Sequence, residues 1–161
     1  MFRYEEASPD MLNAVWDKNI SEHTGDEQWK HWKEEYISYN SNGSAKTFIV
    51  SYDGSPVGEG MLLISPQCSA VRGRLELANG TDTVNINALR IDKRFEGEGH
   101  ISKLVKIMEK YAFDRGFRHI TIGVEARETR NLSIYLHWGY NRLVTSCTEE
   151  GSLILYYQKD L

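Results

Sequence analysis

The chain has 161 residues, of which 40% are hydrophobic, and 19 Lys and Arg against 23 Asp and Glu give a formal net charge of −4. This size and composition predict one folded domain with a proper core and exclude an intrinsically disordered chain. No apolar run approaches the ~20 residues of a membrane span, and a mildly acidic chain does not favour nucleic acid, so we expect neither partner.

Up to residue 64, the sequence predicts these elements in order: a strand over 2–7, a helix from Ser8, a helix over 26–39, and strands over 47–52 and 58–64. Ser8-Pro9 is typical of a helix start, because Ser caps the N-terminus and Pro fits the first turn. Asn42-Gly43 is expected to end the second helix, and Asp53-Gly54 is a frequent hairpin turn.

The rest of the chain predicts strands over 71–77 and 83–91, a helix over 99–115, a strand over 119–125, a helix over 129–138 and a strand over 153–157. The helix over 99–115 has the strongest signal, because apolar residues recur at helical spacing and Gly116 is a typical stop. No repeat or linker divides the sequence. We therefore expect a single domain over residues 1–161, an α+β sandwich with a mostly antiparallel sheet.

Charge and cysteines indicate the setting in which the chain works. Residues 1–35 hold 4 basic and 9 acidic side chains, an acidic excess that fits a solvated helical surface or a negative potential near a cationic substrate. Cys68 and Cys147 have no metal-binding spacing and fit reduced thiols. The first residues include Glu5 and Glu6 and lack the apolar stretch of a signal peptide, so we expect a cytoplasmic protein.

A glycine-rich loop, Arg94-Phe95-Glu96-Gly97-Glu98-Gly99, lies between a predicted strand and a predicted helix. Glycines allow an anion to approach the backbone, and the N-terminus of a helix carries a partial positive charge. No Gly-Lys-Ser/Thr follows, and the glycine spacing does not fit a dinucleotide fold. Taken alone, the loop indicates an anion site or a plain tight turn.

A second pattern covers residues 131–140. Asn131 and Tyr135 are four residues apart and share one face of the predicted helix, whereas Leu132 and Leu136 share the neighbouring face and would pack on the sheet. Taken alone, Tyr135 also fits a core position, because a buried tyrosine needs only one hydrogen-bond partner.

Together the two patterns resemble the GNAT family of acyl-CoA-dependent N-acetyltransferases over about residues 84–140. Arg94, Gly97 and Gly99 match the family's loop, Arg/Gln-x-x-Gly-x-Gly/Ala. The family's later signature is matched in spacing by the following residues: Val124, Glu128, Asn131, Ile134, Tyr135, Gly139 and Tyr140. Glu128 and Asn131 depart from the usual Asn and Ala. In a register shifted by two, Glu96 and Ile101 also replace the usual residues.

The resemblance implies a GNAT-like α/β/α sandwich, whose mixed, mostly antiparallel central sheet is splayed between 89–91 and 119–125 at the cofactor site. It implies acetyl-CoA as co-substrate, no metal, and coenzyme contacts at these positions: Leu89, Arg90, Ile91, Arg94, Glu96, Gly97, Glu98, Gly99, His100, Ile101, Ser102, Asn131 and Tyr135. The loop amides would hold the pyrophosphate, and the backbone of 89–91 would pair with the pantetheine arm. Tyr135 would protonate the leaving thiolate as general acid.

The sequence does not identify the general base. Glu59, Glu76 and Asp82 lie on or near predicted strands, and we expect each to be a surface carboxylate rather than a catalytic one, because a base must reach the amine directly or through one water.

Two further groups lie on or near the second predicted helix. The first, which we expect to be solvated rather than metal-binding, consists of His23, Glu27, His31 and Glu35. The second, which fits a core face better than an aromatic cage for a cation, consists of Trp29, Trp32, Tyr36 and Tyr39.

We therefore expect an enzyme that moves an acetyl group from acetyl-CoA to a primary amine of a small cationic molecule or to an amino terminus. The alternative is a non-catalytic acyl-CoA-binding sensor of the same fold, for which the departures at Glu96 and Ile101 are the only support. A nucleotide phosphotransferase built on the glycine loop would need a lysine and metal-binding carboxylates, and the sequence lacks this pattern. Aminoglycosides, polyamines, amino acids and peptide N-termini all stay open as acceptors, and a homodimer stays open as an assembly.

Overall fold

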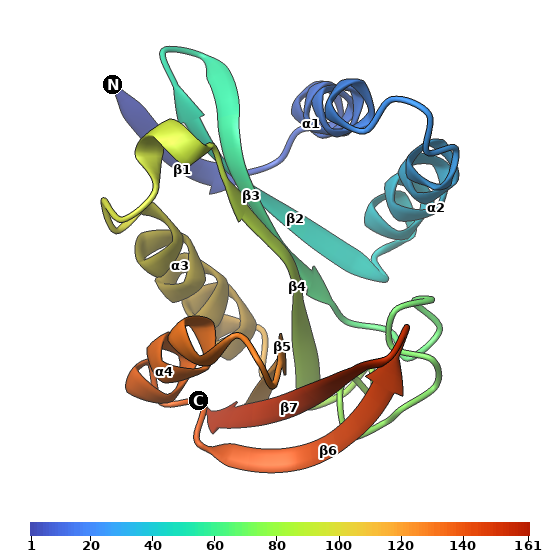
Figure 1. The fold of residues 1–161 in the computed structure, drawn as a ribbon, viewed down its shortest axis with the longest axis vertical. Helices are drawn as coiled ribbons and strands as arrows, with labels where there is room; N and C mark the ends of the chain where they lie inside the picture. The colour runs from blue at the N-terminus through green and yellow to red at the C-terminus, as the bar shows by residue number, and fades with distance from the viewer. The chain divides into compact units, whose positions relative to one another are not determined.

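The structure is a computed structural model that describes residues 1–161. Its elements in chain order (Figure 1) are β1 (Phe2–Glu6), α1 (Pro9–Glu22), α2 (Gln28–Asn42), β2 (Ala45–Tyr52), β3 (Ser55–Leu63), β4 (Thr83–Ile91), the 3₁₀ helix η1 (Lys93–Phe95), α3 (His100–Asp114), β5 (His119–Glu125), α4 (Thr129–His137), β6 (Arg142–Glu149) and β7 (Ser152–Asp160). The strands hydrogen-bond in the order β1-β2-β3-β4-β5-β7-β6. This mixed sheet with four helices confirms the predicted α+β class.

The chain forms two compact units, each built from two separate stretches of sequence. The first unit consists of Met1–Leu62 and Ala88–Met108, and the second of Leu63–Asn87 and Glu109–Leu161. None of the helices combines the length and the apolar character that a membrane span requires.

Local sequence signals set the element boundaries in the first unit. The Ser8 hydroxyl accepts a hydrogen bond from the Met11 N–H at 3.2 Å, and Pro9 opens α1, as predicted. Helix α2 ends where Gly43 takes a left-handed φ of 83°. Asp53 and Gly54 both have positive φ, 49° and 84°, which is the geometry of a two-residue hairpin turn between β2 and β3.

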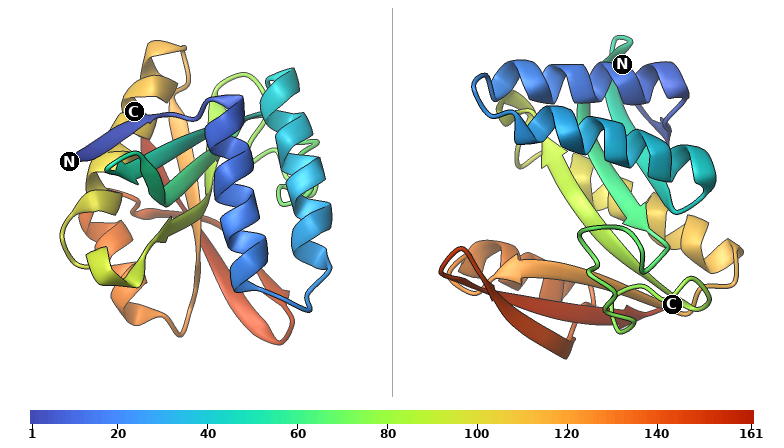
Figure 2. Two further views of the ribbon diagram at one scale, coloured as in Figure 1. Left: turned by 90° about the horizontal axis from the view of Figure 1, so that it is seen from above. Right: turned by 90° about the vertical axis from the view of Figure 1, so that its right-hand side faces the viewer.

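Helices α1 and α2 lie side by side in the first unit (Figure 2). The rings of Trp16 and Tyr36 stack between them, with centroids 5.7 Å apart, and Lys33 Nζ lies 2.7 Å from Asp17 Oδ1. Of the four aromatic residues on α2, Tyr36 is buried and the others are half-buried. The buried apolar core of this unit includes Leu12, Val15, Trp16, Phe48, Ile49, Val50, Met61, Leu62 and Leu104.

The second unit is built on β4, β5, β7 and β6. Thr83–Ile86 of β4 pair in parallel with His119–Ile122 of β5, and β5 pairs antiparallel with β7. The core of this unit includes Val71, Leu77, Val84, Ile86, Ile120, Ile122 and Tyr140.

Strand β6 is the strand that we did not predict. It pairs antiparallel with β7 through a turn at Glu150 and Gly151, whose φ values of 49° and 81° are typical of a two-residue hairpin. Two signals were present in the sequence, because Glu150-Gly151 is a frequent turn and Val144, Thr145 and Thr148 are β-branched.

The predicted strand over residues 71–77 is wrong, because this segment is a series of turns. Its N–H groups donate hydrogen bonds to carbonyls three residues earlier. The Val71 N–H donates to the Cys68 carbonyl at 2.9 Å, and the Leu77 N–H donates to the Arg74 carbonyl at 3.0 Å. Arg72 and Gly73 have positive φ, which interrupts an extended chain. Val71 and Leu77 are nevertheless buried, so the hydrophobic alternation reflects two core anchors rather than a strand.

Candidate functional site

The glycine-rich loop lies in the first unit; it begins within η1 and ends directly before α3. Gly97 and Gly99 have φ values of 77° and 85°, a region that favours glycine. A Cβ built at either position meets no atom within 4 Å, so the space above both residues is open. The first N–H groups of α3 have no partner within the helix. Open space at the two glycines that precede these N–H groups leaves room for an anionic ligand.

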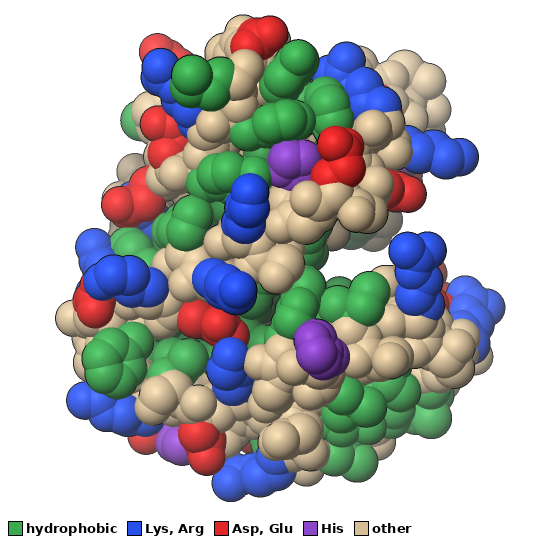
Figure 3. Space-filling model, turned by 90° about the vertical axis from the view of Figure 1, so that its left-hand side faces the viewer, with side chains coloured by type: hydrophobic (Ala, Val, Ile, Leu, Met, Phe, Trp, Pro, Cys, Tyr) green, Lys and Arg blue, Asp and Glu red, His purple; other side chains and the backbone are tan.

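Acidic side chains of the loop point into solvent. Glu96 and Glu98 are both exposed, and Arg94 Nη2 lies 3.6 Å from Asp92 Oδ2. On the face drawn in Figure 3, Lys and Arg side chains are spread among apolar and acidic ones instead of forming one basic patch. An anion at this loop would therefore depend on backbone N–H groups more than on a cluster of basic residues.

His100 opens α3 but buries its ring. Its Nδ1 lies 2.6 Å from the Tyr4 hydroxyl, and its ring centroid lies 4.1 Å from that of Phe2. Its Nε2 is buried and has no partner. The ring thus ties β1 to the start of α3, and the backbone N–H of His100 is the part that a ligand could use.

The end of β4 directs its side chains to two faces. Ala88 has a φ of 57°, a conformation that costs a residue with a Cβ about 1–2 kcal/mol. Beyond it, Leu89 and Ile91 pack against Gly60 and Gly58, where a built Cβ would lie 2.8 and 2.7 Å from their side chains. Arg90 points to the face that Glu59 occupies.

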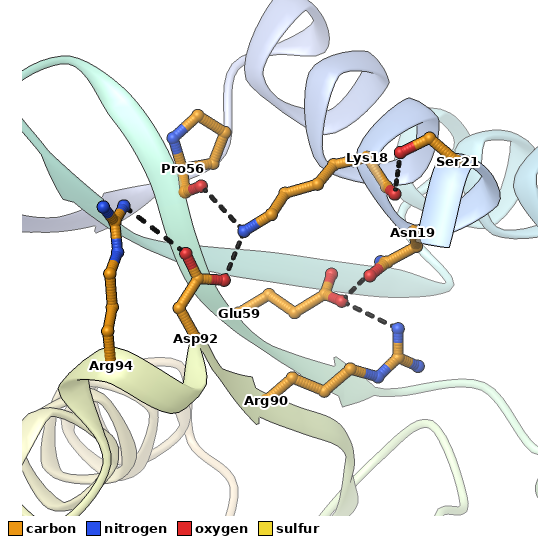
Figure 4. A network of polar contacts seen from close by, with 8 residues as sticks. All are labelled: Lys18, Asn19, Ser21, Pro56, Glu59, Arg90, Asp92 and Arg94. Atoms are coloured by element: carbon orange, nitrogen blue, oxygen red, sulfur yellow. Dashed lines mark hydrogen bonds and ion pairs between the residues drawn. The ribbon is translucent and has the colours of Figure 1, made fainter. Parts of the chain in front are cut away.

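Glu59 is a buried carboxylate, so the expectation that it lies on the surface is wrong (Figure 4). It is 2% exposed, and its Oε1 accepts hydrogen bonds from Asn19 Nδ2 at 2.8 Å and from Arg90 Nη1 at 2.9 Å. Its Oε2 is buried without a partner. Burial raises the pKa of Glu59, against the opposing effects of the Arg90 charge and the Asn19 hydrogen bond. An acid in the middle of a buried strand was the available signal.

The other two candidate carboxylates are exposed, as predicted. Glu76 lies in the irregular segment of the second unit, and Asp82 precedes β4. Hydrogen bonds from Asn79 and Thr83 lower the pKa of Asp82, so this side chain serves a local turn.

The Arg90 guanidinium has a second neighbour on α2. Its central carbon lies 4.9 Å from the centroid of the Trp29 ring, and His23 stacks on the same indole at 3.9 Å. Lys18 pairs with Asp92 and donates to the Pro56 carbonyl at 3.4 Å, which completes the network of Figure 4. Trp29 thus does face a cation, but the cation is the chain's own arginine.

Tyr135 and Asn131 lie on α4, in the second unit. The Tyr135 ring lies 5.6 Å from that of Trp138, and Asn131 Nδ2 donates to Glu128 Oε2 at 3.0 Å. Burial, followed by the negative charge of Glu128, raises the pKa of Tyr135. The phenol therefore keeps its proton at neutral pH, as a proton donor must.

The structure brings the predicted coenzyme residues together in two groups. Eleven of them are consecutive or nearly so in the first unit, from Leu89 to Ser102, and Asn131 and Tyr135 share α4 in the second. His31 Nε2 lies 3.4 Å from Glu35 Oε2, which is an ordinary pair one helical turn apart. No group of three or more His, Cys, Asp or Glu side chains is placed to hold a metal ion.

Comparison with known proteins identifies the family. The model of the acetyltransferase (GNAT) family matches residues 9–140, and the chain belongs to this family. It is therefore an acyltransferase of the class that uses an acyl-CoA donor. No curated protein sequence matches the chain.

Solved structures with the same fold cover nearly the whole chain. An N-acetyltransferase from Staphylococcus aureus Mu50 is 15% identical, with a TM-score of 0.74, over 99% of this chain and 98% of that one. A GNAT acetyltransferase from Elizabethkingia anophelis with acetyl-CoA bound is 14% identical, with a TM-score of 0.63, over 99% and 98%. A PaiA N-acetyltransferase from Thermoplasma acidophilum in complex with coenzyme A is 13% identical, with a TM-score of 0.65, over 100% and 99%. At these identities the likeness shows the fold alone.

Proposed function

We propose that the chain transfers an acetyl group from acetyl-CoA to the primary amine of a small cationic molecule or to an amino terminus. The observation that carries this proposal is the pair of left-handed glycines that leaves open space at the start of α3. The acidic excess of residues 1–35 supports a cationic amine, although Asp17 and Glu27 have lysine partners.

The glycine loop fits a coenzyme pyrophosphate, because side chains at positions 97 and 99 would fill the space that such a ligand needs. The N–H groups from Gly97 to Ser102 would hold the phosphate oxygens, and the backbone of Leu89, Arg90 and Ile91 would pair with the pantetheine arm. Acetyl-CoA, when bound, supplies the acetyl group as an activated thioester. The loop side chains of Arg94, Glu96 and Glu98 lie outside this contact, in solvent.

In the transfer, a bond forms between the amine nitrogen and the acetyl carbon, and the bond from that carbon to sulfur breaks. The amine loses a proton and the departing sulfur gains one. Tyr135 would donate the proton to sulfur, since its raised pKa keeps the hydroxyl protonated. Asn131, one turn earlier on α4, holds Glu128, whose charge contributes to that pKa.

Release of free thiol from acetyl-CoA in the presence of an amine panel tests the activity. Turnover with at least one primary amine is expected. Binding of acetyl-CoA without any thiol release would instead favour a non-catalytic sensor of the same fold.

Tyr135→Phe tests the general acid, because it keeps the ring and removes only the hydroxyl. We expect kcat to fall by about 10²–10⁴-fold, the range of general acid–base catalysis, while the affinity for acetyl-CoA stays nearly unchanged. Tyr140→Phe is the matched control. Its hydroxyl donates to Glu109 Oε2 at 2.9 Å, so its loss should lower stability and leave kcat intact. A Tyr135→Phe rate within twofold of wild type at every pH would contradict the assignment.

A further inference from the structure

The Arg90 guanidinium is held in a fixed place but only partly used. One of its N–H groups donates to Glu59, and its face lies over the Trp29 ring. A guanidinium has five N–H donors in a planar fork, so most of them remain after this bond. The Arg90 side chain is 37% exposed, so a ligand can reach these donors.

Packing does not explain the pair formed by Arg90 and Glu59. Burying a carboxylate is costly even beside a cation, and an apolar pair of similar volume is often as stable. Here the cost is larger still, because Glu59 Oε2 has no hydrogen-bond partner. The pair does, however, hold the guanidinium against the indole while the Arg90 side chain stays 37% exposed. That arrangement is typical of a site that recognises a planar oxyanion.

The surrounding charges favour a ligand with one negative charge. Glu59 already balances one positive charge, and Glu22 adds negative potential near the same carboxylate. Lys18 adds positive potential near Glu59, but it is paired with Asp92, whose charge opposes it. A carboxylate can use two N–H groups of one guanidinium edge, whereas a dianionic phosphate would meet more repulsion.

We propose that Arg90 binds a carboxylate of the acceptor, which makes the acceptor an amino acid or a closely related amine that carries a carboxylate. This inference rests on the proposed function, because Arg90 lies in the segment assigned to the thioester arm, where the acceptor amine must arrive. The ammonium of such a molecule suits the acidic excess of residues 1–35, and Arg90 compensates its carboxylate.

The experiment compares L-amino acids with their α-carboxamides in matched pairs, with O-phosphoethanolamine as a phosphate probe. Calorimetry on the protein saturated with coenzyme A measures binding, and thiol release from acetyl-CoA measures turnover. At least one amino acid should bind about 10- to 100-fold more tightly than its amide, the range for hydrogen bonds to a charged group. In Arg90→Gln this preference should disappear, and in Arg90→Lys it should be intermediate. Arg3→Gln is the control, because it removes the same charge from an exposed side chain.

Several results would overturn the inference. These are equal binding of acid and amide, no binding of any amino acid, a preference that survives in folded Arg90→Gln protein or is undiminished in Arg90→Lys, and stronger binding of the phosphate probe. Equal weakening of coenzyme A and all acceptors in Arg90→Gln would assign the guanidinium to the coenzyme. Arg90-dependent binding of an amino acid without any thiol release would support this site and contradict the proposed function. Equal thiol release with an amino acid and with its carboxamide would support the proposed function and contradict this site.

Discussion

The tripeptide Gly-Glu-Gly occurs twice in the first unit, and its two copies have opposite surroundings. In Gly58-Glu59-Gly60, on β3, both glycines are packed so closely that a Cβ would lie under 3 Å from neighbouring atoms, and the glutamate is buried. In Gly97-Glu98-Gly99, before α3, both glycines have positive φ and open space, and the glutamate is exposed. The first copy needs glycine for close packing, whereas the second needs it for backbone conformation and access.

The difference shows why composition alone does not identify a ligand site. The same three residues pack the interior in a strand and leave room for a ligand in a loop. What separates them is the element in which each copy lies, which determines φ and the distance to the next layer of atoms. Substitutions that add a side chain at one glycine of each copy therefore test the comparison directly.

The largest effect is expected for Gly99→Val. A side chain at this position would fill the open space and strain a φ of 85°, so we expect the affinity for coenzyme A to fall about 100-fold, the loss of about two charged hydrogen bonds. Calorimetry measures this directly. Gly151→Val is the matched control, since Gly151 also has a positive φ of 81° and open space but lies in the β6–β7 turn. Equal affinities of Gly99→Val and wild type would refute the placement of the pyrophosphate.

An intermediate effect is expected for Gly60→Ala. The new methyl group would lie 2.8 Å from Leu89 Cδ2 and 2.9 Å from Met108 Sδ, so overpacking should cost about 1–3 kcal/mol of the free energy of unfolding. Denaturant unfolding measures the loss. Adding Leu89→Ala should recover part of it, because the two changes then compensate. The packing explanation would fail if Gly60→Ala were as stable as wild type.

The smallest expected effect is a change of stability with pH that depends on Glu59 and not on Glu98. Burial raises the pKa of Glu59 in the folded chain above its unfolded value of about 4.3. Stabilisation from the protonated form is therefore complete below the unfolded pKa and is lost as pH rises through the folded pKa. The free energy of unfolding of Glu59→Gln should thus improve relative to wild type as pH rises from about 4 to about 7.

Glu98→Gln is the control for this trend, because it removes the same charge from an exposed side chain. The unfolding free energies of the three proteins at several pH values provide the comparison. If the free energy of unfolding of Glu59→Gln fell relative to that of wild type as pH rises, the direction of the shift would be contradicted.

Local chemistry explains which parts of the structure were predictable. Ser8, Gly43 and the Asp53-Gly54 turn each act through neighbours a few residues away, so the sequence alone predicts them. The glycine loop and Tyr135 were found through the spacing of the family's motifs, and their element boundaries are confirmed. Their roles in catalysis and coenzyme contact stay predictions.

Long-range contacts explain the rest. Glu59 has its partners at Asn19 and Arg90, far away in the sequence, so its own segment gave a signal for burial but none for the groups that it binds. Val71 and Leu77 alternate like strand residues but are core anchors of a turn segment, partly because the Thr121 hydroxyl donates to the Leu77 carbonyl at 2.9 Å. Strand β6 pairs with β7, and the Glu150-Gly151 turn between the two strands was its main signal in the sequence.

The discontinuity of both units has a consequence for folding during synthesis. The first unit needs the end of β4, the glycine loop and the first part of α3, which the ribosome makes only after the residues of β1 to β3 and the whole segment 63–87. Until then the Glu59 carboxylate lacks Arg90, and the Tyr4 hydroxyl lacks His100. The first unit is therefore complete only when residue 108 has been made, and the second only when the last residues of the chain have been made. The chain must wait for long loops to close, at an entropic cost that grows only slowly with loop length.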